Sequence, residues 1–151
     1  MFFYLLALAI VAVDQAIKYA VHASMRLGQS FPLLGNVLKL TYVRNTGAAF
    51  SLFIGFSPYL AMVGALVVLA VVYFHYRVPA NRLILQAGMA FILGGSLGNL
   101  IDRVFRSYVI DYLDITIWPV FNFADIMINV GVIMIAFKIF QEEGRDVSGA
   151  V

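Results

Sequence analysis

The feature that most constrains this chain is a set of four apolar runs, each about 19 residues long. A transmembrane helix needs about 20 mostly apolar residues, so runs of this length indicate membrane spans. Composition agrees, because 63% of the 151 residues are hydrophobic and 12% are charged, against roughly half and a quarter in soluble domains. The predicted spans have the approximate bounds Phe2–Val21, Pro58–Tyr76, Leu83–Ile101 and Val120–Phe140.

These spans predict an all-α membrane protein with a single domain over residues 1–151. An even number of spans places both termini on one side of the membrane. The connections 22–57 and 102–119 then share the opposite side. The loop Val78–Asn81 is short, so the second and third spans are antiparallel neighbours.

The first connection has strand character. Val37–Val43 is rich in β-branched and aromatic residues and follows a Gly35–Asn36 turn signal. We expect Ala49–Phe53 either to pair with this strand or to form a short interfacial helix. The expected fold is therefore four transmembrane helices with a small β-rich insertion between the first two.

The composition also excludes several kinds of chemistry. The chain has no cysteine, which excludes disulfides, thiolate metal sites and a cysteine nucleophile. The net charge of +2 is too small to indicate a nucleic-acid partner. The two histidines, His22 and His75, have no well-placed serine for a Ser-His triad. A His-Glu-x-x-His motif is absent, and neither a metal nor another cofactor is predicted.

Charged and polar residues inside the spans carry the strongest functional signal, since a charge at a bilayer centre costs roughly 2.5–3.5 kcal/mol. In the first span, Asp14 and Lys18 are one helical turn apart on one face. Their spacing predicts an ion pair near the membrane surface, which by itself is more consistent with a structural role than with catalysis.

The third span ends in a polar stripe formed by Asn99, Asp102 and Arg103 at i, i+3 and i+4. The preceding small residues of Gly94–Gly98 predict close helix packing. The stripe is either hydrogen-bonding contact between helices or one wall of a polar cavity.

The fourth span carries Asn122, Asp125 and Asn129 on one helical face, at i, i+3 and i+7. Asp125 has no lysine or arginine within one turn, and an unpaired acid in a span is by default a functional residue. Asp111 lies 14 residues earlier. Pro119 favours a break before the last helix, which allows the chain to turn back and bring Asp111 near Asp125.

Asn45 belongs to the segment Arg44–Ser51 in the first connection. Asn-Thr-Gly is a turn signal, and that is its simplest interpretation. The sharper hypothesis is a loop directed at the same cavity.

Two neighbouring aspartates suit amide hydrolysis. Like charges a few ångströms apart resist double ionisation, so one carboxyl keeps its proton. The ionised carboxylate can take a proton from water while the protonated one polarises the carbonyl. Asparagine and arginine side chains nearby can hold the substrate backbone and the developing oxyanion.

Five motifs taken together resemble bacterial lipoprotein signal peptidase (signal peptidase II). They occur in that family's order, in its four-helix layout and over almost the whole chain. In this sequence they read Asp14-Gln15-x-x-Lys18, Asn45-Thr46-Gly47-Ala48-Ala49-Phe50-Ser51, Gly94-Gly95-x-x-Gly98-Asn99-Leu100-Ile101-Asp102-Arg103, Val109-Ile110-Asp111-Tyr112 and Phe121-Asn122-x-Ala124-Asp125.

The resemblance implies an aspartic endopeptidase of the bacterial cytoplasmic membrane, with both termini in the cytoplasm and the active site near the extracytoplasmic face. We expect the protein to be a monomer. It implies diacylglyceryl-modified prolipoproteins as substrates, cut just before the lipidated cysteine, contact with membrane lipids, and inhibition by globomycin. It maps Asp111 and Asp125 onto the catalytic dyad. Substrate-binding or dyad-ordering positions map onto Asn45, Asn99, Arg103 and Asn122, and supporting positions onto Asp14, Lys18 and Asp102.

The sequence departs from the family pattern at three points. The connection between Asp111 and Asp125 is short, Tyr112 stands where phenylalanine is frequent, and Asp114 is a third nearby acid. We expect Asp111 rather than Asp114 to be catalytic, because Asp111 occupies the motif position.

Two other classes of protein are less consistent with the sequence. A proton-coupled transporter or an assembly adaptor would spread polar residues through the depth of the bundle, whereas here they gather toward one end. A different intramembrane aspartic protease would carry Gly-x-Gly-Asp, which is absent. A lipid phosphotransferase would need acids closely spaced on one helix to hold two metals.

The orientation of the chain gives the first prediction. Lysine and arginine are more numerous on the side of the two long connections than on the side of the termini, so the positive-inside rule points against cytoplasmic termini. Several of those cations sit beside acids or in the polar motifs, and we follow the resemblance instead. Reporter fusions after residue 80 should report the cytoplasm and fusions after residue 45 the outside. The reverse pattern would refute this topology.

Overall fold

The structure is a computed structural model that describes residues 1–35, 37–47 and 57–148. Within these residues it has four α-helices, and each is long and apolar enough to cross a membrane. A small antiparallel sheet accompanies the helices. In chain order the elements are α1 (Phe2–Ser24), β1 (Ser30–Leu34), β2 (Leu38–Asn45), α2 (Ser57–Arg77), α3 (Leu83–Arg106), β3 (Val109–Asp114) and α4 (Phe123–Ser148).

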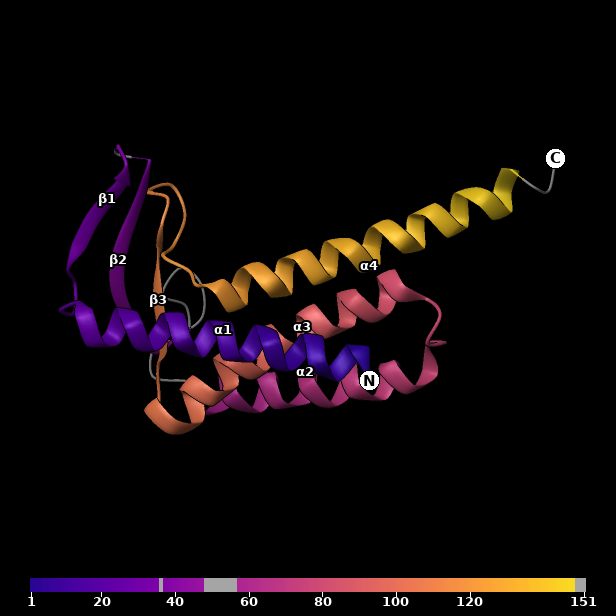
Figure 1. The fold of residues 1–151 in the computed structure, drawn as a ribbon, viewed down its shortest axis with the longest axis horizontal. Helices are drawn as coiled ribbons and strands as arrows, with labels where there is room; N and C mark the ends of the chain where they lie inside the picture. Colours follow the sequence, from indigo (N-terminus) through magenta and orange to yellow (C-terminus); the bar gives the residue numbers. More distant parts are fainter. Residues whose placement is uncertain (36, 48–56, 149–151) are drawn as a thin grey trace.

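α3 is the central helix, in contact with α1, α2 and α4 (Figure 1). Glycines permit the contacts with α1 and α4, since a methyl group in their place would meet the backbone of the next helix. A Cβ at Gly95 would lie 2.4 Å from the carbonyl oxygen of Ala124. A Cβ at Gly131 of α4 would lie 2.5 Å from the carbonyl oxygen of Gly88. The predicted close packing through small residues is therefore present, and van der Waals contact holds α3 and α4 together.

The three strands lie across one end of the helices in the order β1–β2–β3 (Figure 1). β1 and β2 form a hairpin whose turn includes Gly35 at φ +52°, a conformation that glycine adopts at little cost. β3 pairs with β2 so that Asp111 opposes Val43 and Val109 opposes Asn45. The sheet therefore joins two connections that are far apart in the sequence.

Asn122 caps α4. Its side-chain oxygen accepts a hydrogen bond from the backbone N–H of Asp125 at 3.0 Å, and the Asp125 carboxylate accepts one from the backbone N–H of Asn122 at 3.1 Å. This reciprocal pair is a capping box, with asparagine and aspartate in place of the more frequent serine or threonine and glutamate. The cap fixes the Asp125 carboxylate in the first turn, where the helix dipole favours negative charge.

The predicted fold class is confirmed, but two expectations within it are wrong. The sheet is not confined to the first connection, because β3 comes from 102–119, which we expected to be only a polar connection. The β-branched and aromatic residues Val109, Ile110 and Tyr112 suit a strand once a partner is available. Asn122 does not lie on the helical face with Asp125, because its side chain serves as the cap and α4 starts one residue later.

The helices also extend beyond several predicted bounds. α1 continues to Ser24 and α3 to Arg106, since the polar residues at their ends remain helical. α3 then stops at Ser107, which adopts a left-handed conformation with φ 65°. The strand Val37–Val43 is observed as β2, while Ala49–Phe53 lies outside the described residues.

The α3–α4 contact predicts the effect of adding a methyl group. Gly131→Ala should lower the free energy of unfolding by about 1–3 kcal/mol, because backbone atoms of α3 leave no room for a Cβ. Gly64→Ala on α2 is the matched control, since its Cβ would meet Leu100 at 3.8 Å, an ordinary contact. Thermal unfolding in detergent measures both. Equal melting temperatures for the two variants would contradict the close α3–α4 crossing.

Candidate active site

A cavity of about 590 Å³ opens where α3 and α4 meet the sheet. Its polar wall contains Asp111 from β3 and Asp125 from α4. Its apolar wall includes one face of α4 and the segment between β3 and α4. The lining residues are Asn45, Asn99, Arg103, Val109, Asp111, Ile115, Trp118, Pro119, Val120, Phe121, Asn122, Asp125, Ile126, Asn129, Val130 and Ile133.

Asp111 is buried, with 2% of its surface exposed. One carboxylate oxygen accepts a hydrogen bond from Asn45 Nδ2 at 2.8 Å, and the other accepts one from Asn122 Nδ2 at 2.6 Å. Asn45 reaches Asp111 because the residue opposite Asp111 is Val43, two positions before Asn45 on the same face of β2. The sequence hypothesis that the Asn45 segment points at the cavity is therefore supported at Asn45 itself.

Asp125 is partly exposed to the cavity and also accepts two hydrogen bonds. Asn99 Nδ2 donates to one carboxylate oxygen at 2.8 Å, and the backbone N–H of Asn122 donates to the other at 3.1 Å. Asn122 therefore contacts both acids, Asp111 through its side chain and Asp125 through its backbone. The two carboxylates share one asparagine, although they come from a strand and a helix.

The third acid of the region lies apart from this cavity. Asp114 accepts hydrogen bonds from the Thr41 hydroxyl at 2.9 Å and from the backbone N–H of Thr116 at 2.8 Å. It stands three residues after Asp111, so the two side chains point to opposite faces of β3. Asp114 thus stabilises the turn after the strand.

Arg103 lines the cavity, and its positive charge acts on the carboxylates of Asp125 and Asp111. Within the described ranges its guanidinium makes neither a hydrogen bond nor an ion pair. Asn129 also lines the cavity and donates from Nδ2 to the Asp125 backbone carbonyl at 2.8 Å. Arg103 is therefore the cation on the cavity wall with donors available to a bound group.

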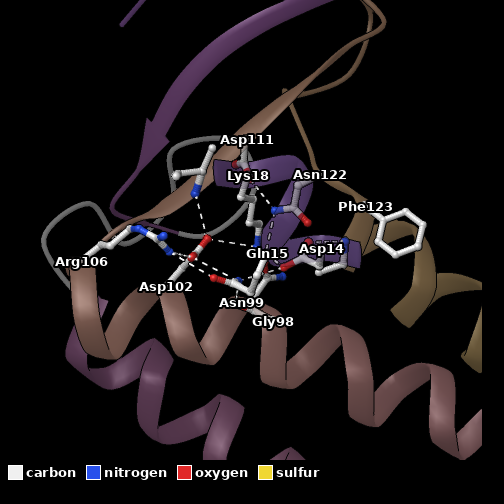
Figure 2. Close-up of polar contacts among 12 residues, drawn as sticks. Asp14, Gln15, Lys18, Gly98, Asn99, Asp102, Arg106, Asp111, Asn122 and Phe123 are labelled. Atoms are coloured by element: carbon white, nitrogen blue, oxygen red, sulfur yellow. Dashed lines mark hydrogen bonds and ion pairs between the residues drawn. The ribbon is translucent and has the colours of Figure 1, made fainter. Parts of the chain in front are cut away.

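The predicted Asp14–Lys18 ion pair is present, at 2.9 Å, but it is one part of a larger buried cluster. Lys18 also pairs with Asp102 at 3.0 Å, and Asp102 pairs with Arg106 (Figure 2). Asp102 thus separates from its two neighbours in the predicted stripe, since Asn99 and Arg103 line the cavity while Asp102 faces α1.

Two members of this cluster were not among the predicted site residues. Gln15 donates to the Gly98 carbonyl oxygen at 3.1 Å and accepts from Arg106 at 3.3 Å. A sequence signal for Arg106 exists, because it follows Asp102 by four residues, the spacing of a helical ion pair. Gln15 carries no comparable spacing signal, but it is polar within an apolar run and stands in the first of the five family motifs.

Burial raises the pKa of Asp111 to about 7, with the Asp125 carboxylate adding to the effect. The hydrogen bonds from Asn45 and Asn122 act in the opposite direction but are outweighed. Near neutral pH, Asp111 therefore retains its proton in a large share of molecules. A protonated carboxyl beside a carboxylate is the combination that two-aspartate hydrolysis requires.

The family model described as signal peptidase (SPase) II matches residues 6–141 of this chain. The chain belongs to the signal peptidase II family. The lipoprotein signal peptidase of Moorella thermoacetica is 41% identical over 147 residues, which cover 95% of this chain and 98% of that protein. The lipoprotein signal peptidase of Bacillus subtilis is 34% identical over 149 residues, which cover 96% and 97%.

Solved structures agree with the family. A bacterial membrane enzyme determined by the in meso method at 2.3 Å resolution superposes with a TM-score of 0.89 at 31% identity, covering 95% of this chain and 90% of that one. A second, at 1.9 Å resolution, gives a TM-score of 0.83 at 33% identity, covering 91% of each chain. The predicted family, fold and aspartic peptidase class of this signal peptidase II family member are thereby confirmed.

The raised pKa of Asp111 predicts a pH dependence of stability. Between about 4 and about 7 the folded protein holds a proton on Asp111 that the unfolded chain has lost, so stability falls as the pH rises through this range. Asp111→Asn should flatten the slope of unfolding free energy against pH, as measured by thermal unfolding in detergent. Asp114→Asn, which removes a carboxyl outside the cavity, should keep the wild-type slope. An unchanged slope in Asp111→Asn would show that this carboxyl ionises alike in both states.

Proposed function

We propose that this chain removes signal peptides from lipoprotein precursors, with Asp111 and Asp125 as its catalytic dyad. The observation that carries the proposal is that both aspartates line one cavity and are held by the same residue, Asn122. Relatives that match nearly the whole chain are named lipoprotein signal peptidases, which supports this substrate class.

The two acids have different roles in this mechanism. Asp111 is the more buried, and its raised pKa makes it the protonated partner. Asp125 is the general base, because it is the acid more open to the cavity and its carboxylate is oriented by hydrogen bonds from Asn99 and the Asn122 backbone.

Hydrolysis then proceeds in two balanced steps. Asp125 takes a proton from water as the water oxygen bonds to the carbonyl carbon, and Asp111 gives its proton to the carbonyl oxygen, forming a diol. Asp125 next gives its proton to the amide nitrogen as the C–N bond breaks. Asp111 recovers its proton from a diol hydroxyl, so one water is consumed and both acids return to their starting states.

The polar residues around the dyad supply binding and orientation. Arg103 is placed to bind the substrate carbonyl and the charge that develops on it. Asn45, Asn99 and Asn122 hold the carboxylates through neutral donors.

The shape of the cavity suits a lipidated substrate. Ile126, Val130 and Ile133 extend the cavity wall along the apolar face of α4, below Asp125. A peptide carbonyl at the dyad would place a diacylglyceryl group on the next residue against this wall, with its acyl chains among lipids. This arrangement favours cleavage just before a lipidated cysteine.

The proposed setting is the bacterial cytoplasmic membrane. The dyad lies at the sheet end of the helices, and the N-terminus and the far end of α4 lie toward the other end (Figure 1). With cytoplasmic termini, the site faces the extracytoplasmic surface, where lipidated precursors are displayed. We also propose that residues 1–151 act as one monomeric domain and that globomycin occupies the cavity.

The dyad predicts the loss of activity in two variants. Asp111→Asn and Asp125→Asn should each lower the rate of precursor cleavage by at least about 10²–10⁴-fold, because asparagine can neither accept a proton from water nor return one. Mass spectrometry of a diacylglyceryl-modified precursor incubated with purified protein measures cleavage and its position.

Asp114→Asn is the matched control and should retain most activity, since Asp114 lies outside the cavity. Thermal unfolding should show that all three variants are folded. Cleavage by Asp125→Asn at the wild-type rate would refute the two-aspartate mechanism. An inactive Asp114→Asn with an active Asp111→Asn would mean that Asp114 is the true partner.

A further inference from the structure

Lys18 is the most completely bonded charge in the described part of the chain. Its side chain is fully buried, with 0% exposed, and it comes from α1, a helix that contributes no residue to the cavity. Its ammonium group contacts three acceptors: Asp14 at 2.9 Å, Asp102 at 3.0 Å and Asn99 Oδ1 at 2.9 Å (Figure 2). An ammonium has three N–H donors, so each has one partner.

The contact with Asn99 determines which way the Asn99 amide faces. Lysine only donates hydrogen bonds, so the Asn99 oxygen must face Lys18. The Asn99 nitrogen then faces the Asp125 carboxylate and donates to it at 2.8 Å. Asn122 Nδ2 donates to the same Asn99 oxygen at 3.2 Å, which strengthens this orientation.

The two carboxylates bound to Lys18 each hold the backbone beside one dyad member. Asp14 accepts a hydrogen bond from the N–H of Ala124, the residue before Asp125, at 3.1 Å. Asp102 accepts one from the N–H of Ile110, the residue before Asp111, at 3.2 Å. α4 and β3 are therefore both attached to the same ammonium through one carboxylate each.

We infer that Lys18 is a positioning residue for the dyad, which it holds through Asn99 and through the backbone contacts of Asp14 and Asp102. This inference rests on the proposed function, since it assigns Lys18 a task in the reaction of Asp111 and Asp125. A residue that only stabilises the fold would change the stability of the protein but not its rate. A positioning residue changes the orientation and charge at the dyad, and therefore also the rate of cleavage and its pH dependence.

The charge of Lys18 provides a specific readout. Asp111 faces Asp125 from α4, Arg103 from α3 and Lys18 from α1, and the positive charge of Lys18 lowers the pKa of Asp111. Removing that charge raises this pKa further. Activity that depends on a protonated Asp111 is then retained to a higher pH.

The test compares Lys18→Met with Gln86→Leu. Gln86 is also buried and joins α3 to α2, through hydrogen bonds to His75 at 2.6 Å and to the Val78 carbonyl at 2.8 Å. It lies in the first turn of α3, about three and a half turns before Asn99, and does not line the cavity. Both variants should unfold at a lower temperature than wild type.

Only Lys18→Met should change catalysis. We expect its kcat to fall by about 10²-fold with a nearly unchanged KM, as for a misplaced catalytic group. The alkaline limb of its pH–rate profile should move to higher pH. Gln86→Leu should keep the wild-type kcat and pH profile. Wild-type kcat and pH profile in folded Lys18→Met would overturn the inference.

Asn99→Asp provides a second test that does not require folding of Lys18→Met. The new carboxylate still accepts from Lys18, so the contact with α1 is kept, and thermal unfolding in detergent checks that the variant folds. It has no N–H for Asp125, and kcat should fall by about 10²-fold. A wild-type rate in Asn99→Asp would overturn the relay through Asn99.

Asp125→Asn, assayed in parallel, separates this inference from the proposed function. An active Asp125→Asn means that the two-aspartate mechanism itself is wrong. If Asp125→Asn is inactive while Lys18→Met and Asn99→Asp match wild type, the mechanism stands and only the role of Lys18 is wrong.

Discussion

The burial of the Lys18 ammonium is the constraint on which the rest of the structure depends. Removing a charged group from water costs several kcal/mol even after relaxation, and attraction to partners offsets this only if every donor is well placed. Lys18 meets that requirement with acceptors from α1 and α3. Those acceptors bind the backbone of α4 and β3. The need to pair this one buried charge thereby fixes α1, α3, α4 and β3 relative to one another.

The residues in direct contact with the two cavity acids are neutral amides. A lysine or arginine bonded directly to a buried carboxylate would favour its ionised form and lower its pKa. Asn45, Asn99 and Asn122 instead supply oriented N–H groups without a full charge. Burial and the mutual repulsion of the two acids can then keep one proton on the pair. The charged residues Lys18, Asp14 and Asp102 hold the surrounding helices and strand, whereas, among the described residues, only neutral amides bond to the two acids.

The position of the polar cluster also explains how a membrane chain accommodates so many polar groups. Most of them gather at the sheet end of α1, α3 and α4, while the middle of α3 packs through glycines against apolar neighbours. A transporter would need polar groups along the depth of the bundle. A protease needs them at one level only, where a peptide bond and water meet, and the arrangement here has that form.

The sequence by itself determined the four spans, the Asp14–Lys18 pair and the two candidate aspartates, because these depend on run length, helical spacing and the cost of charge in lipid. It did not determine β3, since a short segment becomes a strand only when β2 lies beside it. The sequence also did not predict that Asp102 faces α1 while Asn99 and Arg103 line the cavity. Positions i, i+3 and i+4 lie on one broad helical face, and only tertiary packing decides which neighbour each residue contacts. The tertiary structure decided that Asn122 caps α4 and bridges both acids, which requires β3 and α4 to meet in space.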